Sequence, residues 1–144
     1  MTMLRDARQV AINQVVEALL EAAHLHDQGA HALDAEPDLG RALRALAERR
    51  RRAAQELGEH VRRLGDLPSE PDADLQAARD VLAWVHDALA GDQRDQVLER
   101  SRQAEEQLAE KVRVALGEDL PSDTQALLEK LPAVPELRAA LGSG

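Results

Sequence analysis

The residues best suited to chemistry in this 144-residue chain are a few carboxylates and imidazoles. Glu21 and His24 have a Glu-x-x-His spacing, which places both side chains on one face of a helix. In helical bundles such carboxylates bridge metal ions and imidazoles complete the coordination, and Glu48 or Glu105 could contribute from other helices. The same residues fit the solvated face of an amphipathic helix. That second interpretation is favoured, because a two-metal site needs more ligands than the chain supplies.

Other kinds of chemistry find little support in the residue types. The chain has no cysteine, and its single aromatic residue is Trp84, so a thiolate nucleophile and a stacking surface for bases are excluded. Ser101 has no histidine placed by the sequence to activate it, and no glycine-rich phosphate loop is present. A net charge of −9 opposes binding to the phosphate backbone of nucleic acids. The sequence thus predicts a protein without catalytic activity, cofactor or nucleic-acid partner.

Apolar residues recur at alternating steps of three and four along most of the chain, which is the pattern of amphipathic helices. His26 lies on the inward stripe of the first helix, where a core histidine satisfied by one neighbour is expected. Ser122 and Gln125 have the spacing of a capping box, and Gly65 suits the end of a helix. The expected helices cover residues 4–33, 38–64, 73–90 and 92–116, followed by a short helix that begins at residue 122.

Helices of this length with short connections predict an all-α fold, an antiparallel four-helix bundle. The bundle and its short fifth helix should cover residues 1–131, and residues 132–144 should form a proline-broken tail. No segment approaches the roughly 20 apolar residues of a membrane span, so we expect a cytoplasmic protein with no membrane partner.

Four stretches in these helices occur in an order and spacing shared with a known group of proteins. They read LLEAAHLHDQGA, ERRRRAAQEL, VRRLGD and EEQLAEKVRVALGEDLP. In these stretches the chain resembles an uncharacterised bacterial ferritin-like bundle family over residues 10–131. The family pattern of an acidic residue and then a Tyr is matched by Glu21 and His26, its acidic pair by Glu105 and Glu106, and a later Tyr by Val112. The resemblance implies a ferritin-like four-helix bundle and a role in bacterial stress physiology.

The chain departs from iron-binding members of this fold at the ligand positions. Such proteins carry Glu-x-x-His on two helices, but the second helix here reads Glu48-Arg-Arg-Arg51 and the fourth reads Glu105-x-x-Leu108. A guanidinium stays protonated and cannot bind a metal. We therefore expect a metal-free structural or interaction protein. The alternative is an iron- or manganese-binding oxidoreductase or storage module with an unorthodox site.

An arginine run, LAERRRRAAQEL at residues 46–57, stands out in this acidic chain. Four successive helical residues step about 100° each, so one of these arginines must face inward. Arg50 falls on the inward stripe near the middle of its helix, as Glu105 does on the fourth helix. We expect the two to form a partly buried ion pair, with Glu21 or His26 satisfying the remaining donors. If the register slips by one residue, Arg51 takes the place of Arg50.

The expected third helix carries a second apolar stripe, formed by Val81, Trp84 and Ala88, beside its inward one. Exposed apolar stripes on proteins usually mark a partner surface. We therefore predict a homodimer through this helix or the C-terminal segment. Sedimentation equilibrium at roughly tens of micromolar protein should detect a dimer, and a monomer at every concentration would contradict the prediction.

Overall fold

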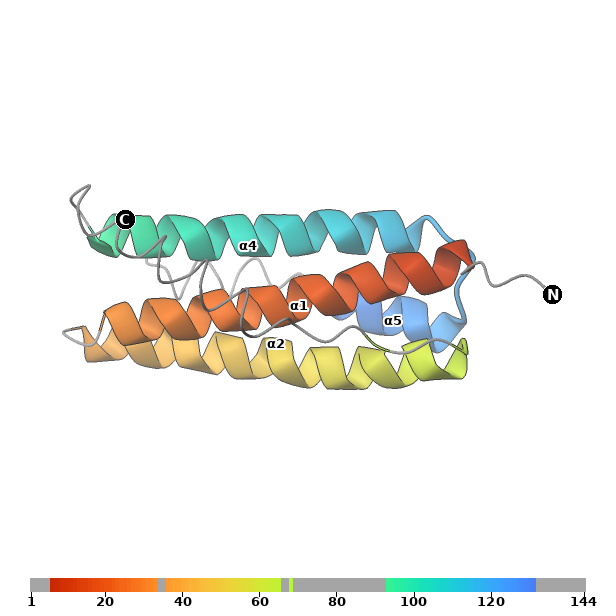
Figure 1. Cartoon of the computed structure of the whole chain (residues 1–144), viewed down its shortest axis with the longest axis horizontal. Helices are drawn as coiled ribbons and strands as arrows, with labels where there is room; N and C mark the ends of the chain where they lie inside the picture. The colour runs from red at the N-terminus through yellow and green to blue at the C-terminus, as the bar shows by residue number, and fades with distance from the viewer. Residues whose placement is uncertain (1–5, 34–35, 66–67, 69–92, 132–144) are drawn as a thin grey trace.

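The computed structural model describes residues 6–33, 36–65, 68 and 93–131, and within these ranges it contains four α-helices and no strand. α1 packs along both α2 and α4, and the short α5 lies against one end of α2 and α4 (Figure 1). The all-helical fold class is thereby confirmed. A bundle of four long helices stays a prediction, because the expected helix over residues 73–90 lies outside the described residues. The helices are α1 (Ala7–Ala32), α2 (Pro37–Arg63), α4 (Gln93–Leu116) and α5 (Ser122–Lys130).

The start of α1 and the end of α2 follow local capping chemistry. Asp6 is the N-cap of α1: its carboxylate accepts a 2.8 Å hydrogen bond from the Arg8 backbone N–H, and Gln9 accepts one from the Asp6 N–H. This capping box explains why the helix begins at Ala7 rather than at residue 4. At the end of α2, Gly65 adopts a φ of +84°, a conformation that favours glycine.

The capping box expected at the start of α5 is wrong. The helix begins at Ser122 as expected, but its N-cap is Pro121 and no side chain caps it. Pro121 already has the extended backbone that an N-cap needs, with φ −54° and ψ 147°, so Ser122 falls inside the helix. Asp123 instead accepts a 3.0 Å hydrogen bond from the Thr124 backbone N–H.

The inward stripe predicted for α1 is confirmed, since every one of its residues is buried. These residues are Ile12, Val16, Leu19, Ala23, His26, Ala30 and Leu33. Most of the buried apolar residues fall into two clusters. The larger includes Leu19, Leu57 and Leu108, and the smaller, toward the other end, includes Leu33 and Val97. Between them along the chain lie buried polar residues of α1, α2 and α4, which form the candidate site described below. None of the described helices is long and apolar enough to cross a membrane.

α1 and α4 approach closely where Gly29 faces α4. A Cβ atom on Gly29 would lie 2.7 Å from Cγ1 of Val97 and 3.9 Å from Oγ of Ser101. Val97 is buried and β-branched, so it has little freedom to move aside. A glycine is therefore required here by the distance between the helices, although its backbone is helical.

We predict that Gly29→Ala destabilises the protein by about 1–3 kcal/mol, because overpacking outweighs the better helix propensity of alanine. Gly40→Ala is the matched control. A Cβ there would make only ordinary contacts, the nearest at 3.5 Å, so stability should stay level or rise by up to about 1 kcal/mol. Urea unfolding of both variants measures the difference. Equal stabilities would show that α1 and α4 are less closely packed.

Candidate functional site

The centre of the candidate site is a buried ion pair between α2 and α4. Nε of Arg50 donates a 3.0 Å hydrogen bond to Oε2 of Glu105, and Nη2 of Arg50 donates to Oε1 of the same carboxylate. The pair is therefore bidentate, the strongest arrangement for arginine and a carboxylate. Arg50 is 3% exposed and Glu105 7% exposed, so both charges are withdrawn from water.

His26 of α1 joins this pair to a buried hydroxyl. Its Nε2 lies 2.9 Å from Oε2 of Glu105, and its Nδ1 lies 3.0 Å from Oγ of Ser101. An ionised carboxylate can only accept hydrogen bonds, so Nε2 carries a proton. In the neutral ring Nδ1 is then an acceptor, and the Ser101 hydroxyl donates to it. Each polar atom of the imidazole thus has a partner.

The remaining guanidinium nitrogen reaches the end of α5. Nη1 of Arg50 donates a 2.7 Å hydrogen bond to the backbone carbonyl of Leu131. Carbonyl groups at a helix C-terminus carry partial negative charge and lack partners within the helix. The Leu131 carbonyl therefore suits a cation, and the cluster contains groups from α1, α2, α4 and the end of α5. We call these residues (His26, Arg50, Ser101, Glu105 and the Leu131 carbonyl) the central cluster.

The electrostatics of the central cluster favour an ionised Glu105. Burial alone would raise the pKa of this carboxyl, but the hydrogen bonds from His26 and Arg50, with the charge of the guanidinium, outweigh it and lower the pKa below its usual value. The carboxylate is thus held charged inside the protein. The chemical role of the cluster is thus that the Glu105 carboxylate binds one positive charge, the guanidinium of Arg50, which belongs to the protein itself.

Helical spacing in the sequence places the side chains of the central cluster, though not the Leu131 carbonyl. Ser101 and Glu105 are four residues apart, so both face α1 from α4. Small buried residues surround the cluster along the helices, which leaves room for its larger side chains. They are Ala22, Ala23, Gly29, Ala30, Ala47 and Ala104.

The neighbouring arginines have other partners. Arg51 forms ion pairs with Asp27 of α1 and with Glu48, and Arg52 lies 3.2 Å from Glu48. The alternative register, with Arg51 in the central position, is therefore wrong: its side chain is 42% exposed. The structure brings Arg50 and Glu105 together, with His26 rather than Glu21 beside them.

The weaker metal-ligand candidates do not converge. Glu21 is exposed, His24 is half-buried, Glu48 is engaged by two arginines, and Glu105 is engaged by Arg50 and His26. Among the described residues, no group of three or more histidine, aspartate or glutamate side chains is placed to hold a metal ion. The expected interface residues lie outside the described ranges: Val81, Trp84 and Ala88.

Sequence reasoning missed three polar contacts. These contacts are Ser101 with His26, the Leu131 carbonyl with Arg50, and Nδ1 of His60, which lies 2.6 Å from Oγ1 of Thr124 in α5. Ser101 could have been found from its spacing to Glu105. The contacts with α5 had no sequence signal, because they depend on how a short helix folds back.

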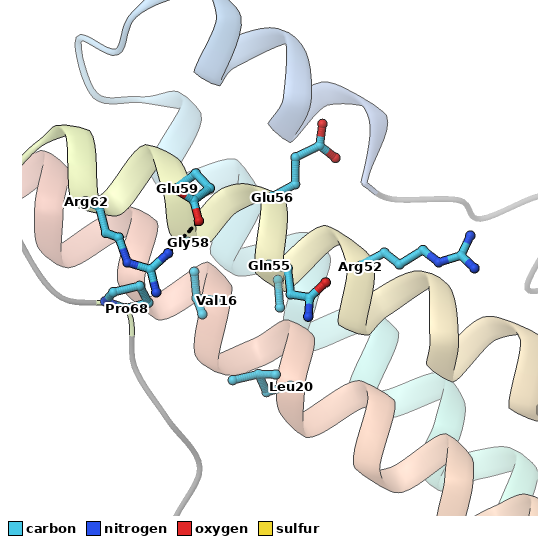
Figure 2. A pocket seen from close by; sticks show the side chains of 10 residues that line it. Val16, Leu20, Arg52, Gln55, Glu56, Gly58, Glu59, Arg62 and Pro68 are labelled. Atoms are coloured by element: carbon cyan, nitrogen blue, oxygen red, sulfur yellow. Dashed lines mark hydrogen bonds and ion pairs between the residues drawn. The ribbon is translucent and has the colours of Figure 1, made fainter.

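A groove on another face of the protein involves α1, α2 and Pro68 (Figure 2). Its apolar lining includes Val16 and Leu20 of α1. Charged residues of α2 stand at its edge, among them Arg62, which donates a 2.6 Å hydrogen bond to Glu59. The lining of the groove is therefore a mixture of apolar and charged groups.

Comparison of this chain with protein-family models, with curated proteins and with solved structures gives no match.

We predict that Arg50→Met and Glu105→Leu each lower the free energy of unfolding by about 3–5 kcal/mol, because each leaves a buried charge unpaired. The double variant should lose less than the sum of the two, with a coupling energy of about 1–3 kcal/mol. Denaturant unfolding of the four proteins in the cycle measures this.

The matched control is Arg52→Met in the same arginine run. Arg52 is 75% exposed, so its removal should change stability by less than about 1 kcal/mol. Additive effects of Arg50→Met and Glu105→Leu would mean that the pair contributes no specific interaction.

Proposed function

We propose that this protein is a non-catalytic, metal-free ferritin-like helical bundle that acts as a structural or interaction protein in bacterial stress physiology. The observation that carries the proposal is the buried guanidinium of Arg50 on the carboxylate of Glu105. In metal-binding bundles the inward carboxylates are occupied by metal ions. Here the carboxylate of Glu105 is occupied by the guanidinium of Arg50 instead of a metal ion. This cation is part of the chain, so it cannot be exchanged or reduced.

The hydrogen bonds of Glu105 support the metal-free part of the proposal. A metal-binding carboxylate must present a free lone pair to the ion. Three of the roughly four lone-pair sites of Glu105 already accept hydrogen bonds, one on each oxygen from Arg50 and a second on Oε2 from His26. A divalent cation at this point would also be repelled by the adjacent guanidinium in a medium of low dielectric constant.

The surface of the described helices supports a role in protein contacts. The groove in Figure 2 is lined by a few apolar residues, among them Leu20 and Pro68, and by charged residues of both signs on α2. Such a mixture of apolar and charged groups is usual at protein–protein interfaces that are not permanent. The homodimer expected from the third helix belongs to the same proposal.

Metal analysis of the protein purified from its native host tests the proposal against the metal-binding alternative. We expect iron and manganese far below stoichiometric amounts, and no binding heat when either metal is titrated into the protein. Glu105→Gln is the control, because its metal content should equal that of the unaltered chain. Near-stoichiometric metal that falls in Glu105→Gln would overturn the proposal in favour of a metal site at the central cluster.

A further inference from the structure

α5 is attached to α2 by polar contacts at both of its ends. At its start, Thr124 lies 2.6 Å from His60, and Asp123 accepts a 2.8 Å hydrogen bond from Nη1 of Arg63. At its end, the Leu131 carbonyl accepts from Arg50 of the central cluster. A helix of nine residues is too short to be stable alone, so its order depends on these contacts and on the burial of its apolar residues.

The contact at His60 requires an unprotonated ring nitrogen. Nδ1 of His60 lies 2.6 Å from Oγ1 of Thr124 and 2.8 Å from Nη2 of Arg63. A guanidinium can only donate hydrogen bonds, so Nδ1 must be the acceptor and the proton of the neutral ring is on Nε2. His60 is 8% exposed, so water offers Nδ1 little alternative.

We propose that α5 is a latch held to α2 by neutral His60, and that acidification releases it. Protonation at Nδ1 turns the acceptor into a donor that faces the Arg63 guanidinium and the Thr124 hydroxyl. The contact with Arg63 then becomes a repulsion between two cations, while the Thr124 hydroxyl must turn from donor to acceptor. The start of α5 is thereby held less firmly, because Arg63, which also binds Asp123 of α5, is repelled by the protonated ring.

The charged groups around His60 set the direction of this effect. Burial of the ring lowers the pKa of His60 most, and the charge of Arg63 lowers it further, while Asp123 of α5 and Glu56 of α2 act in the opposite sense and are outweighed. A lowered pKa means that the unfolded or undocked state binds a proton more readily. Docking of α5 is therefore fully stabilised above about pH 6.5, the ordinary pKa of histidine, and weakens as the pH falls below it.

The other two polar contacts do not titrate in this range. The hydrogen bond from Arg63 lowers the pKa of Asp123 below its usual value, and the pKa of Glu105 is lowered as well. Both carboxylates therefore stay ionised in mildly acidic solution. Of the three polar contacts between α2 and α5, only the one at His60 changes its charge.

Release of α5 has consequences for the interior. Leu128 and Leu131 belong to the larger apolar cluster, together with Leu57 and Leu108. Their departure uncovers part of that cluster and removes the carbonyl from Nη1 of Arg50. The latch thus couples the pH to the exposure of an apolar surface and of one guanidinium nitrogen.

Hydrogen–deuterium exchange of residues 122–130 in the full chain tests the latch, after correction for the pH dependence of intrinsic exchange. We expect protection to fall measurably between about pH 7.5 and pH 5.5, because the undocked state binds a proton at His60 more readily than the docked state. In His60→Gln the side-chain oxygen can accept from the same donors but cannot titrate, so this fall should disappear. His31→Gln, at an exposed histidine near the end of α1, should retain it.

Equal protection of α5 at both pH values in the unaltered chain would overturn the proposal, as would a fall that persists in His60→Gln. A second measurement needs no substitution. In an NMR titration of the unaltered protein, the amide shifts of α5 should follow the titration of His60. Shifts of α5 that stay constant while His60 titrates would equally refute the latch.

Discussion

Burial of the Arg50–Glu105 pair is the constraint on which the arrangement of the described helices depends. Two charges removed from water are costly unless nearly every donor and acceptor finds a partner. Here the partners come from different elements: His26 from α1, the carboxylate from α4 and the Leu131 carbonyl from the end of α5. A shift of α2 or α4 by one residue would separate the two charges, and a shift of α1 would take His26 away from the carboxylate. We therefore expect the pair to specify the register of the helices more than it adds to their stability.

The position of the central cluster along the helices gives it this influence. Apolar packing alone tolerates sliding, because leucine and alanine contacts are similar from one turn to the next. The two apolar clusters lie on either side of the polar residues along α1, α2 and α4. The directional hydrogen bonds of the central cluster, which lies between the two apolar clusters, fix the position of the helices along their axes. Apolar contacts alone leave this position free. The narrow approach of α1 and α4 at Gly29 adds a steric constraint one turn from His26.

The sequence was sufficient for the features that depend on helical periodicity. The long described helices, the buried stripe of α1 and the inward placement of Arg50 and Glu105 all follow from spacing. It was insufficient where a tertiary contact decides. Nothing local shows that the Leu131 carbonyl meets Arg50 or that His60 meets Thr124, because α5 folds back over residues far away in the chain. The predicted cap of α5 was wrong for a local reason: Pro121 occupies the N-cap position that was expected for Ser122.

The arginines of α2 form ion pairs with a different neighbouring helix on each face. Residues 38–66 sum to a net positive charge, whereas residues 1–34 and 92–119 sum to net negative charges. The ion pairs follow this division: Arg50 binds Glu105 of α4, Arg51 binds Asp27 of α1, and Arg63 binds Asp123 of α5.

Successive positions of the arginine run point in different directions, so each of these residues serves a different face of α2. The inward one forms the central pair, the next pairs with α1, and Arg52 pairs with Glu48 on the surface of its own helix. One basic helix that contacts acidic ones also disfavours pairing α2 with a second copy of itself, as like charges do in coiled coils. The run of four arginines therefore lets one helix form ion pairs with two acidic neighbours, α1 and α4, in a single register.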